Sequence, residues 1–141
     1  MATYTKFNQF VEDLAHKVHN LGSDSLKVML TLTAPVATNS VLLDLTEIAA
    51  GNGYTAGGTA TTISSSAETS GTYKLVITDV TFTASGGSIA DFRYIVLYND
   101  TPTSPADPLI GFYDYGATVT VTNGNSFTTD FSAANGVIQI V

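Results

Sequence analysis

The chain has 141 residues, a formal net charge of −7 and no cysteine. This length suits one domain with a single hydrophobic core, and the lack of cysteine excludes disulfides and thiolate metal sites. Only five basic residues are present and none follows Arg93. The acidic second half would repel a phosphate backbone, so we expect no binding to nucleic acid.

The composition favours strands over helices. Charged residues make up 12% of the chain, about half the usual share, whereas β-branched Thr, which suits the solvent face of a sheet, is frequent. No run of 18 apolar residues occurs, and residues 1–9 lack the pattern of a secretion signal. We therefore expect a protein made in the cytoplasm, with no membrane span.

An amphipathic helix is predicted over about residues 5–20. Its apolar residues recur at three- and four-residue steps, which places them on one side of a helix: Phe7, Phe10, Val11, Leu14 and Val18. Thr5 is expected to cap the start, and Leu21-Gly22 to end the helix. We expect the apolar stripe to pack on the rest of the domain or on a partner.

Short strands are predicted over about residues 25–141. Ser25 to Thr33 alternates between apolar and polar residues, as a half-buried strand does. Between Thr72 and Ala84 the alternation changes phase at Thr78-Asp79, which indicates a bulge or a bend between sheets. From Phe92 to Tyr98, the residues that would point to either face of a strand are apolar, apart from Arg93. This is typical of a central strand covered on both faces.

The last third also predicts strands. Leu109 to Tyr115 and Thr118 to Thr122 are expected to be separated at Gly116. Asn123-Gly124-Asn125 predicts a hairpin turn from the second of these into Ser126 to Phe131, and Gly136 to Val141 predicts a final strand. Seven or eight short strands behind one helix indicate a mainly β, single-domain protein. We expect a β-sandwich or jelly-roll-like domain preceded by one N-terminal amphipathic α-helix.

The sequence offers little material for catalysis. His16 and His19 are the only histidines, and two ligands are too few for a metal site. No nucleophile elbow accompanies the serines, and the aspartates suit turns better than a catalytic pair. The glycine-rich residues 51–58 lack the helix and Lys of a phosphate loop. We predict a protein that is not an enzyme and has no cofactor or metal.

Two regions are candidate subunit contacts: the helix stripe and the last strand. The last strand has no charged side chain and is β-prone, a composition that pairs with another strand when its edge is bare. A neighbouring strand of the same fold or another subunit must cover it. The candidate contact residues are Phe7, Phe10, Leu14, Val137, Ile138 and Ile140. We expect a homo-oligomer, taken here to be a trimer.

Tyrosines and the glycine-rich loop are candidate ligand or partner contacts. Tyr94 and Tyr98 share one face of their strand, as do Tyr113 and Tyr115 of theirs. Tyrosine combines a flat apolar face with a polar tip, so these side chains could line a sugar-binding surface, or they could belong to the core or to a subunit contact. The loop is expected to be flexible or to dock a partner. The candidate residues are Asn52, Tyr54, Tyr113 and Tyr115.

Four segments resemble a family of small proteins encoded among the structural genes of tailed bacteriophages and prophages: KFNQFVEDLAHKVHNLGSDSLKVMLTLTAPVATNS, EIAAGNGYTAGG, TSGTYKLVITDVTFTASGGSIADFRYIVLYNDT and DPLIGFYDYG. The resemblance covers nearly the whole chain and implies a virion component, without assigning roles to residues. Within that class the chain is similar to capsid decoration or cement proteins, which implies binding to the major capsid protein or other virion proteins. The alternative is a tail, neck or fibre module that binds a glycan through the tyrosines.

Overall fold

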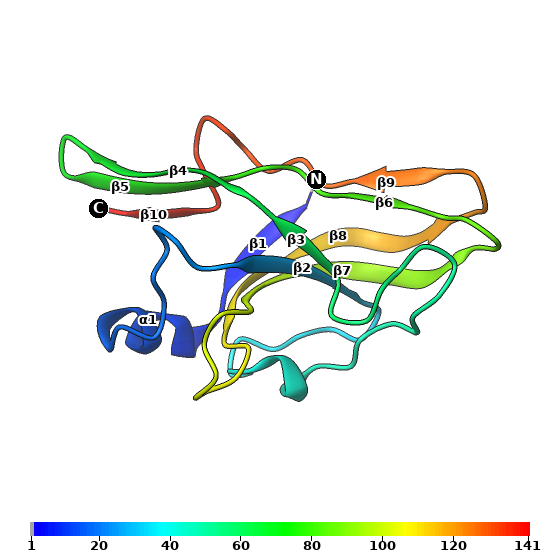
Figure 1. Cartoon of the computed structure of the whole chain (residues 1–141), viewed down its shortest axis with the longest axis horizontal. Helices are drawn as coiled ribbons and strands as arrows, with labels where there is room; N and C mark the ends of the chain where they lie inside the picture. Colours follow the sequence, from blue (N-terminus) through cyan, green and yellow to red (C-terminus); the bar gives the residue numbers. More distant parts are fainter. Residues whose placement is uncertain (1) are drawn as a thin grey trace.

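The computed structural model describes residues 2–141 as a mainly β, sandwich-like fold with one helix near the N-terminus (Figure 1). One layer is an antiparallel five-stranded sheet. In spatial order its strands are β1 (Thr3–Lys6), β8 (Leu109–Val121), β7 (Ile89–Asn99), β2 (Leu26–Thr31) and β3 (Thr59–Thr61). The other layer holds β10 (Ile138–Ile140), β5 (Thr72–Ile77) and β4 (Ile63–Thr69), beside the pair β6 (Thr81–Thr83) and β9 (Ser126–Thr128). The predicted fold class is confirmed.

The N-terminal helix is shorter than predicted. Helix α1 spans Asn8–Ala15, and the segment before it is strand β1, in which Thr5 lies opposite Phe112 of β8. The prediction that Thr5 caps the helix is therefore wrong, because its backbone is paired in a sheet. The helix ends before Lys17, which has a φ of +67°. Eight residues fall well short of a bilayer, and no other helix in the described chain could cross one.

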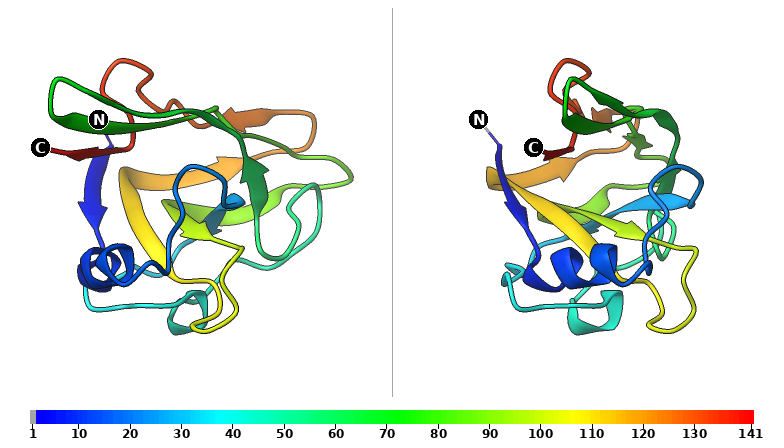
Figure 2. Two further views of the ribbon diagram at one scale, coloured as in Figure 1. Left: turned by 60° about the vertical axis from the view of Figure 1, so that its left-hand side comes forward. Right: turned by 90° about the vertical axis from the view of Figure 1, so that its left-hand side faces the viewer.

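The five-stranded sheet is covered on both faces. Its inner face packs against the second layer through buried apolar residues that include Leu30, Leu97 and Ile110. Its outer face carries a second cluster: Phe7, Met29, Val96, Tyr98, Leu109 and Phe112. Part of the cover there comes from Leu42 of the 3-10 helix η1 (Leu42–Asp44), in the long segment between β2 and β3. This segment lies on the opposite side of the sheet from β4 and β5 (Figure 2). The prediction that Phe92 to Tyr98, in β7, is a central strand covered on both faces is therefore confirmed.

The change of phase at Thr78-Asp79 marks a bend between sheets. Strand β5 pairs with β4 and β10, whereas β6 pairs only with β9. Asp79 fixes the bend, because its Oδ1 accepts a hydrogen bond of 2.8 Å from the backbone N–H of Phe131. The Thr129 hydroxyl oxygen accepts a second bond, of 2.8 Å, from the N–H of Val80. Of the two predicted alternatives, the bend is correct.

Two strand predictions in the last third are wrong. Strand β8 continues through Gly116, which adopts a φ of +93°. The predicted turn forms, because the N–H of Asn125 donates to Thr122 O at 2.9 Å. It does not close a hairpin, since β9 pairs with β6 through Phe127 and Phe82. The end of β8 pairs with β7 instead, so the turn carries the chain from one layer to the other.

Candidate binding groove

A groove of about 350 Å³ opens at the side of the sandwich between β8 and β9. Strand β1 pairs with β8 only as far as Asp114, which lies opposite Thr3. Tyr115 therefore stands beyond the protection of β1. The described residues that line the groove are Ala2, Ile95, Tyr113, Tyr115 and the stretch from Ser126 to Phe131. The groove brings together two of the four predicted ligand residues.

The aromatic walls are held by contacts among themselves. The ring of Tyr113 lies 5.8 Å from that of Phe131, and the ring of Tyr115 lies 5.7 Å from that of Phe127 in a T-shaped arrangement. Phe127 in turn packs edge to face on Phe92 at 5.0 Å. Such pairs fix ring orientation as well as burying apolar area. Tyr115 is nevertheless 46% exposed, so its ring is both positioned and available to a ligand.

The groove is neutral to acidic. Burial raises the pKa of Tyr113 to about 12, so its hydroxyl stays protonated at neutral pH. Asp130, which is exposed, adds a carboxylate to the wall. Among the residues found to line the groove there is no Lys or Arg. The groove therefore suits an uncharged, hydrogen-bonding ligand better than an anion.

Tyr54 does not belong to a ligand site. It is 2% exposed, and its hydroxyl donates to Glu47 Oε1 at 2.7 Å and accepts the N–H of Leu30 at 3.1 Å. Burial, reinforced by the bond to Glu47, raises the pKa of Tyr54 well above its ordinary value. The prediction of a ligand contact is wrong for Tyr54, because its side chain is buried and its hydroxyl already donates and accepts hydrogen bonds within the fold.

Asn52 lies at the surface, but away from the tyrosine groove. It has a φ of +55°, and its side-chain amide donates to Ser88 O at 2.9 Å, just before β7. Its backbone oxygen accepts the N–H of Ser85 at 3.0 Å. The side chain is thus engaged in holding the loop, and the structure does not bring Asn52 together with Tyr113 or Tyr115.

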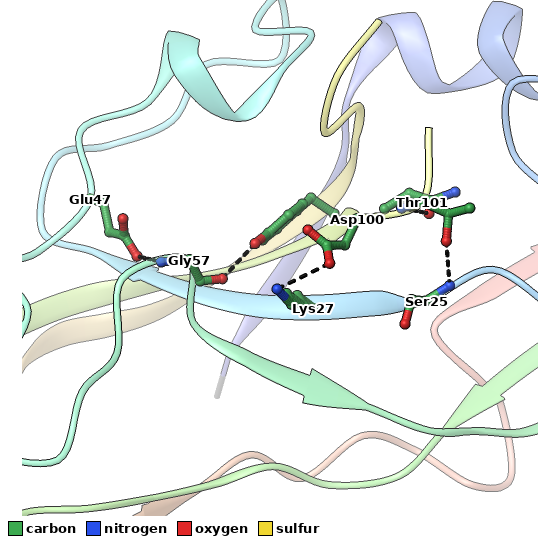
Figure 3. A network of polar contacts seen from close by, with 8 residues as sticks. Ser25, Lys27, Glu47, Gly57, Asp100 and Thr101 are labelled. Carbon is green, nitrogen blue, oxygen red and sulfur yellow. Dashed lines mark hydrogen bonds and ion pairs between the residues drawn. The ribbon is translucent and has the colours of Figure 1, made fainter. Parts of the chain in front are cut away.

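The glycine-rich loop is anchored to the central sheet through polar contacts (Figure 3). Glu47 accepts the N–H of Gly57 at 2.6 Å, and the Tyr98 hydroxyl donates to the oxygen of the same glycine at 2.6 Å. On the neighbouring part of the sheet, Lys27 Nζ lies 3.0 Å from Asp100 Oδ2. The two bonds to Gly57 hold the loop in place, in contrast to a flexible segment, and the predicted alternative that the loop docks a partner stays a prediction.

Most predicted subunit contacts are buried within the chain itself. Phe7, Phe10, Val137 and Ile138 all belong to its core, so the chain itself covers these four side chains. Strand β10 pairs with β5, so the last strand is covered on one side. Leu14 is partly buried and Ile140 is 43% exposed. These two side chains border an apolar hollow of about 300 Å³.

The two histidines point into different environments. His16 is exposed, 3.6 Å from Glu12. His19 is 5% exposed, and its ring packs at a tilt against that of Phe10. Its Nδ1 lies 3.1 Å from the side-chain amide nitrogen of Asn99. Burial lowers the pKa of His19, and this effect outweighs the negative charges of Asp13 and Asp24, which act to raise it. Over residues 2–141 no group of three or more His, Cys, Asp or Glu side chains could hold a metal ion.

Sequence reasoning missed Phe127 and Phe131, which complete the groove opposite the tyrosines. The local signal was present, because Phe127, Thr129 and Phe131 alternate with polar neighbours and so share one face. What the pattern could not provide was their partner, because β9 was assigned to the sheet of β8. If β9 were in the same sheet as Tyr113, its side chains would lie next to the tyrosine on one sheet face. In the structure they face the tyrosine from the other layer.

Comparison of the chain with protein-family models, curated proteins and solved structures finds no match to any of them.

Proposed function

We propose that the protein is a non-enzymatic structural protein of a tailed-phage virion, and specifically a capsid decoration or cement protein that binds the assembled shell. The resemblance of four long segments to phage structural proteins supports the virion, and the compact β-sandwich supports a role in binding. The observation that supports adhesion is Ile140 of β10, which is 43% exposed at the rim of an apolar hollow between α1 and the β10–β5–β4 sheet.

The edge of β10 combines two features of a contact surface. β10 is the last strand of its sheet, paired only with β5, so its other side offers backbone groups to a partner. The hollow is lined by Leu14 of α1, Leu21 and Gly22 of the following loop, Ser66 of β4, Tyr73 of β5 and Ile140 of β10, so it lies over the face of this sheet and reaches its edge at Ile140. A partner strand that pairs with the outer side of β10 gains main-chain hydrogen bonds, and its side chains gain apolar burial where they pack on Ile140.

The hydroxyl-rich surface also supports a structural role. Across the β6–β9 pair, the hydroxyls of Thr81 and Thr128 lie 2.9 Å apart, and those of Thr83 and Ser126 lie 2.8 Å apart. Cross-strand pairs of this kind stabilise a sheet without introducing charge. These hydroxyls hold the two strands together. A protein that acts by presenting a stable surface requires such contacts.

Decoration works by repeated weak contacts. A protein that binds the assembled shell better than the separate capsomers stabilises the shell by mass action, and multiple attachment points raise the overall avidity. In this proposal the partner is the major capsid protein, and copies of the chain assemble as trimers at junctions between capsomers. The protein is made in the host cytoplasm and is located in the virion.

Copy number tests the location. Quantitative mass spectrometry of purified particles, with the major capsid protein as reference, is expected to give hundreds of copies per particle. A value of about a dozen or fewer would reject decoration and favour the tail, neck or fibre module. Cryo-electron microscopy of the same particles places the density directly.

The contact surface is tested with a matched pair of variants. Shells that lack the protein are sedimented with wild type, with Ile140→Asp and with Leu43→Asp, which changes an exposed residue of η1, across the central sheet from β10. A buried charge at the β10 edge is expected to weaken binding by at least about tenfold. The Leu43 variant is expected to bind as wild type does. Equal binding by all three proteins, each with an unchanged melting temperature, would reject this surface.

A further inference from the structure

We propose that the groove between β8 and β9 binds an uncharged oligosaccharide. This inference stands on the geometry of the groove alone, and it is independent of whether the protein belongs to the head or to the tail. The groove has about 350 Å³ of space, at the lower end of the range for small-molecule sites. It opens at the side of the sandwich, where β1 no longer covers β8.

The aromatic wall supplies the main recognition element. Sugar rings present flat faces of C–H groups that pack on aromatic rings, while their hydroxyls require polar partners at the edges. Tyr115 is positioned by its T-shaped contact with Phe127 and remains 46% exposed. Tyr113 is held by tilted ring contacts with Phe131 and Tyr4. Two oriented tyrosine rings on one wall match a ligand with an apolar face and a polar rim.

The polar groups of the groove select an uncharged ligand. The carboxylate of Asp130 accepts hydrogen bonds from sugar hydroxyls and repels acidic sugars. The Tyr113 hydroxyl is protonated at neutral pH, so it both donates and accepts. Because the described lining contains no basic side chain and the whole chain carries a charge of −7, nucleotides and acidic glycans are disfavoured.

A peptide strand fits the groove less well. Strand addition needs a regular run of free backbone groups along an edge. Beyond Asp114 the edge of β8 is interrupted at Gly116, where φ is +93° and the N–H already donates to Asp114 Oδ1 at 2.8 Å. Across the groove, the N–H groups of Thr129 and Phe131 are engaged with Val80 O and Asp79. The side chains, more than the backbone, are therefore available for recognition.

The test uses the full chain with defined probes: maltohexaose, cellohexaose and mannohexaose as uncharged sugars, hexagalacturonate as an acidic one, and the peptide GVIQIV. Binding is measured by NMR titration. We expect at least one uncharged hexasaccharide to shift the ring signals of Tyr113, Tyr115 and Phe127. Tyr115→Ala is expected to weaken this binding about 5- to 10-fold, whereas Tyr115→Phe, which keeps the ring, changes it less than about threefold.

Three results would overturn the proposal. The first is that none of the uncharged sugars binds at about 10 mM, a concentration that detects even a very weak site. The second is that Tyr115→Ala binds like wild type or like the distant control Leu43→Ala. The third is that hexagalacturonate or the peptide shifts the same ring signals more strongly than any uncharged sugar. The melting temperature of each variant shows that it is folded.

Discussion

The ring of Tyr4 in β1 lies over Gly111 in β8, so close that a Cβ at position 111 would come within 2.5 Å of the Tyr4 Cε2 atom. Lys6 is the direct cross-strand partner of Gly111, and Tyr4 reaches it from the diagonal position. The missing side chain of Gly111 is thus what allows the first strand to bury an aromatic ring against β8.

Gly111→Ala is expected to lower the free energy of unfolding by about 1 to 3 kcal/mol, because the added methyl group overpacks the space under Tyr4. Thermal and urea unfolding measure the change. In the double variant with Tyr4→Ala the ring is absent, so the penalty of the alanine should largely disappear. Additive effects of the two substitutions would show that Tyr4 is not the obstacle.

Phe10→Ala is expected to lower the free energy of unfolding by about 3 to 5 kcal/mol, because the side chain is 2% exposed in a filled core. Val11→Ala, at the next position of the same helix, is the control. Val11 is largely exposed, so its change should stay within about 0.5 kcal/mol. A small effect at Phe10 would contradict the packing of α1 against the sandwich.

Tyr54→Phe is expected to lower the free energy of unfolding by about 1 to 3 kcal/mol. The substitution removes the acceptor of the buried Leu30 N–H and the donor to Glu47 while keeping the ring. Chemical denaturation measures the change, and hydrogen exchange of the Leu30 amide should accelerate. Tyr115→Phe removes a hydroxyl from an exposed tyrosine and serves as the control. An equal effect of both substitutions would reject the assigned role of the Tyr54 hydroxyl.

Stability is expected to fall as the pH decreases from about 7 to 5, in part through His19. Burial lowers the pKa of His19 in the folded protein below 6.5, whereas the unfolded chain titrates near that value. Below this pH the unfolded state binds a proton that the folded state does not, so unfolding becomes more favourable. This contribution is present above pH 6.5 and is lost as the pH falls toward the folded pKa.

The pH effect is measured by denaturation of His19→Gln across the same range. Its stability should depend less on pH than that of wild type, while His16→Gln, at an exposed site, should keep the wild-type profile. Identical pH profiles of wild type and His19→Gln would show that the buried imidazole is not responsible.

The sequence predicted features that depend on local burial. Phe92 to Tyr98 was assigned as a doubly covered central strand because both parities are apolar, and β7 lies between β8 and β2 with apolar clusters on each side. The change of phase in the apolar alternation at Asp79 likewise indicated a bulge or a bend, because apolar side chains on both sides of it must still point into the core.

The sequence could not assign long-range pairing. Thr5 and Lys6 were included in the predicted helix, but they pair with the edge of β8 and belong to strand β1. The turn at Asn123-Gly124 was recognised, yet a turn motif does not specify which strand its second arm joins. The aromatic groove was only half predicted for the same reason, because Phe127 faces Tyr115 only when β9 lies in the other layer.

The pairing of β1 with β8 has a consequence for biosynthesis. Thr3 leaves the ribosome well before its partner Asp114, because most of the described residues lie between them in the sequence. Until β8 has been synthesised, the backbone of residues 3–6 lacks its partner strand and the ring of Tyr4 lacks the surface on which it packs. The domain should therefore mature late and as a unit, at the slow rates of folds dominated by non-local contacts. Nascent chains arrested before residue 109 should be readily digested by proteases.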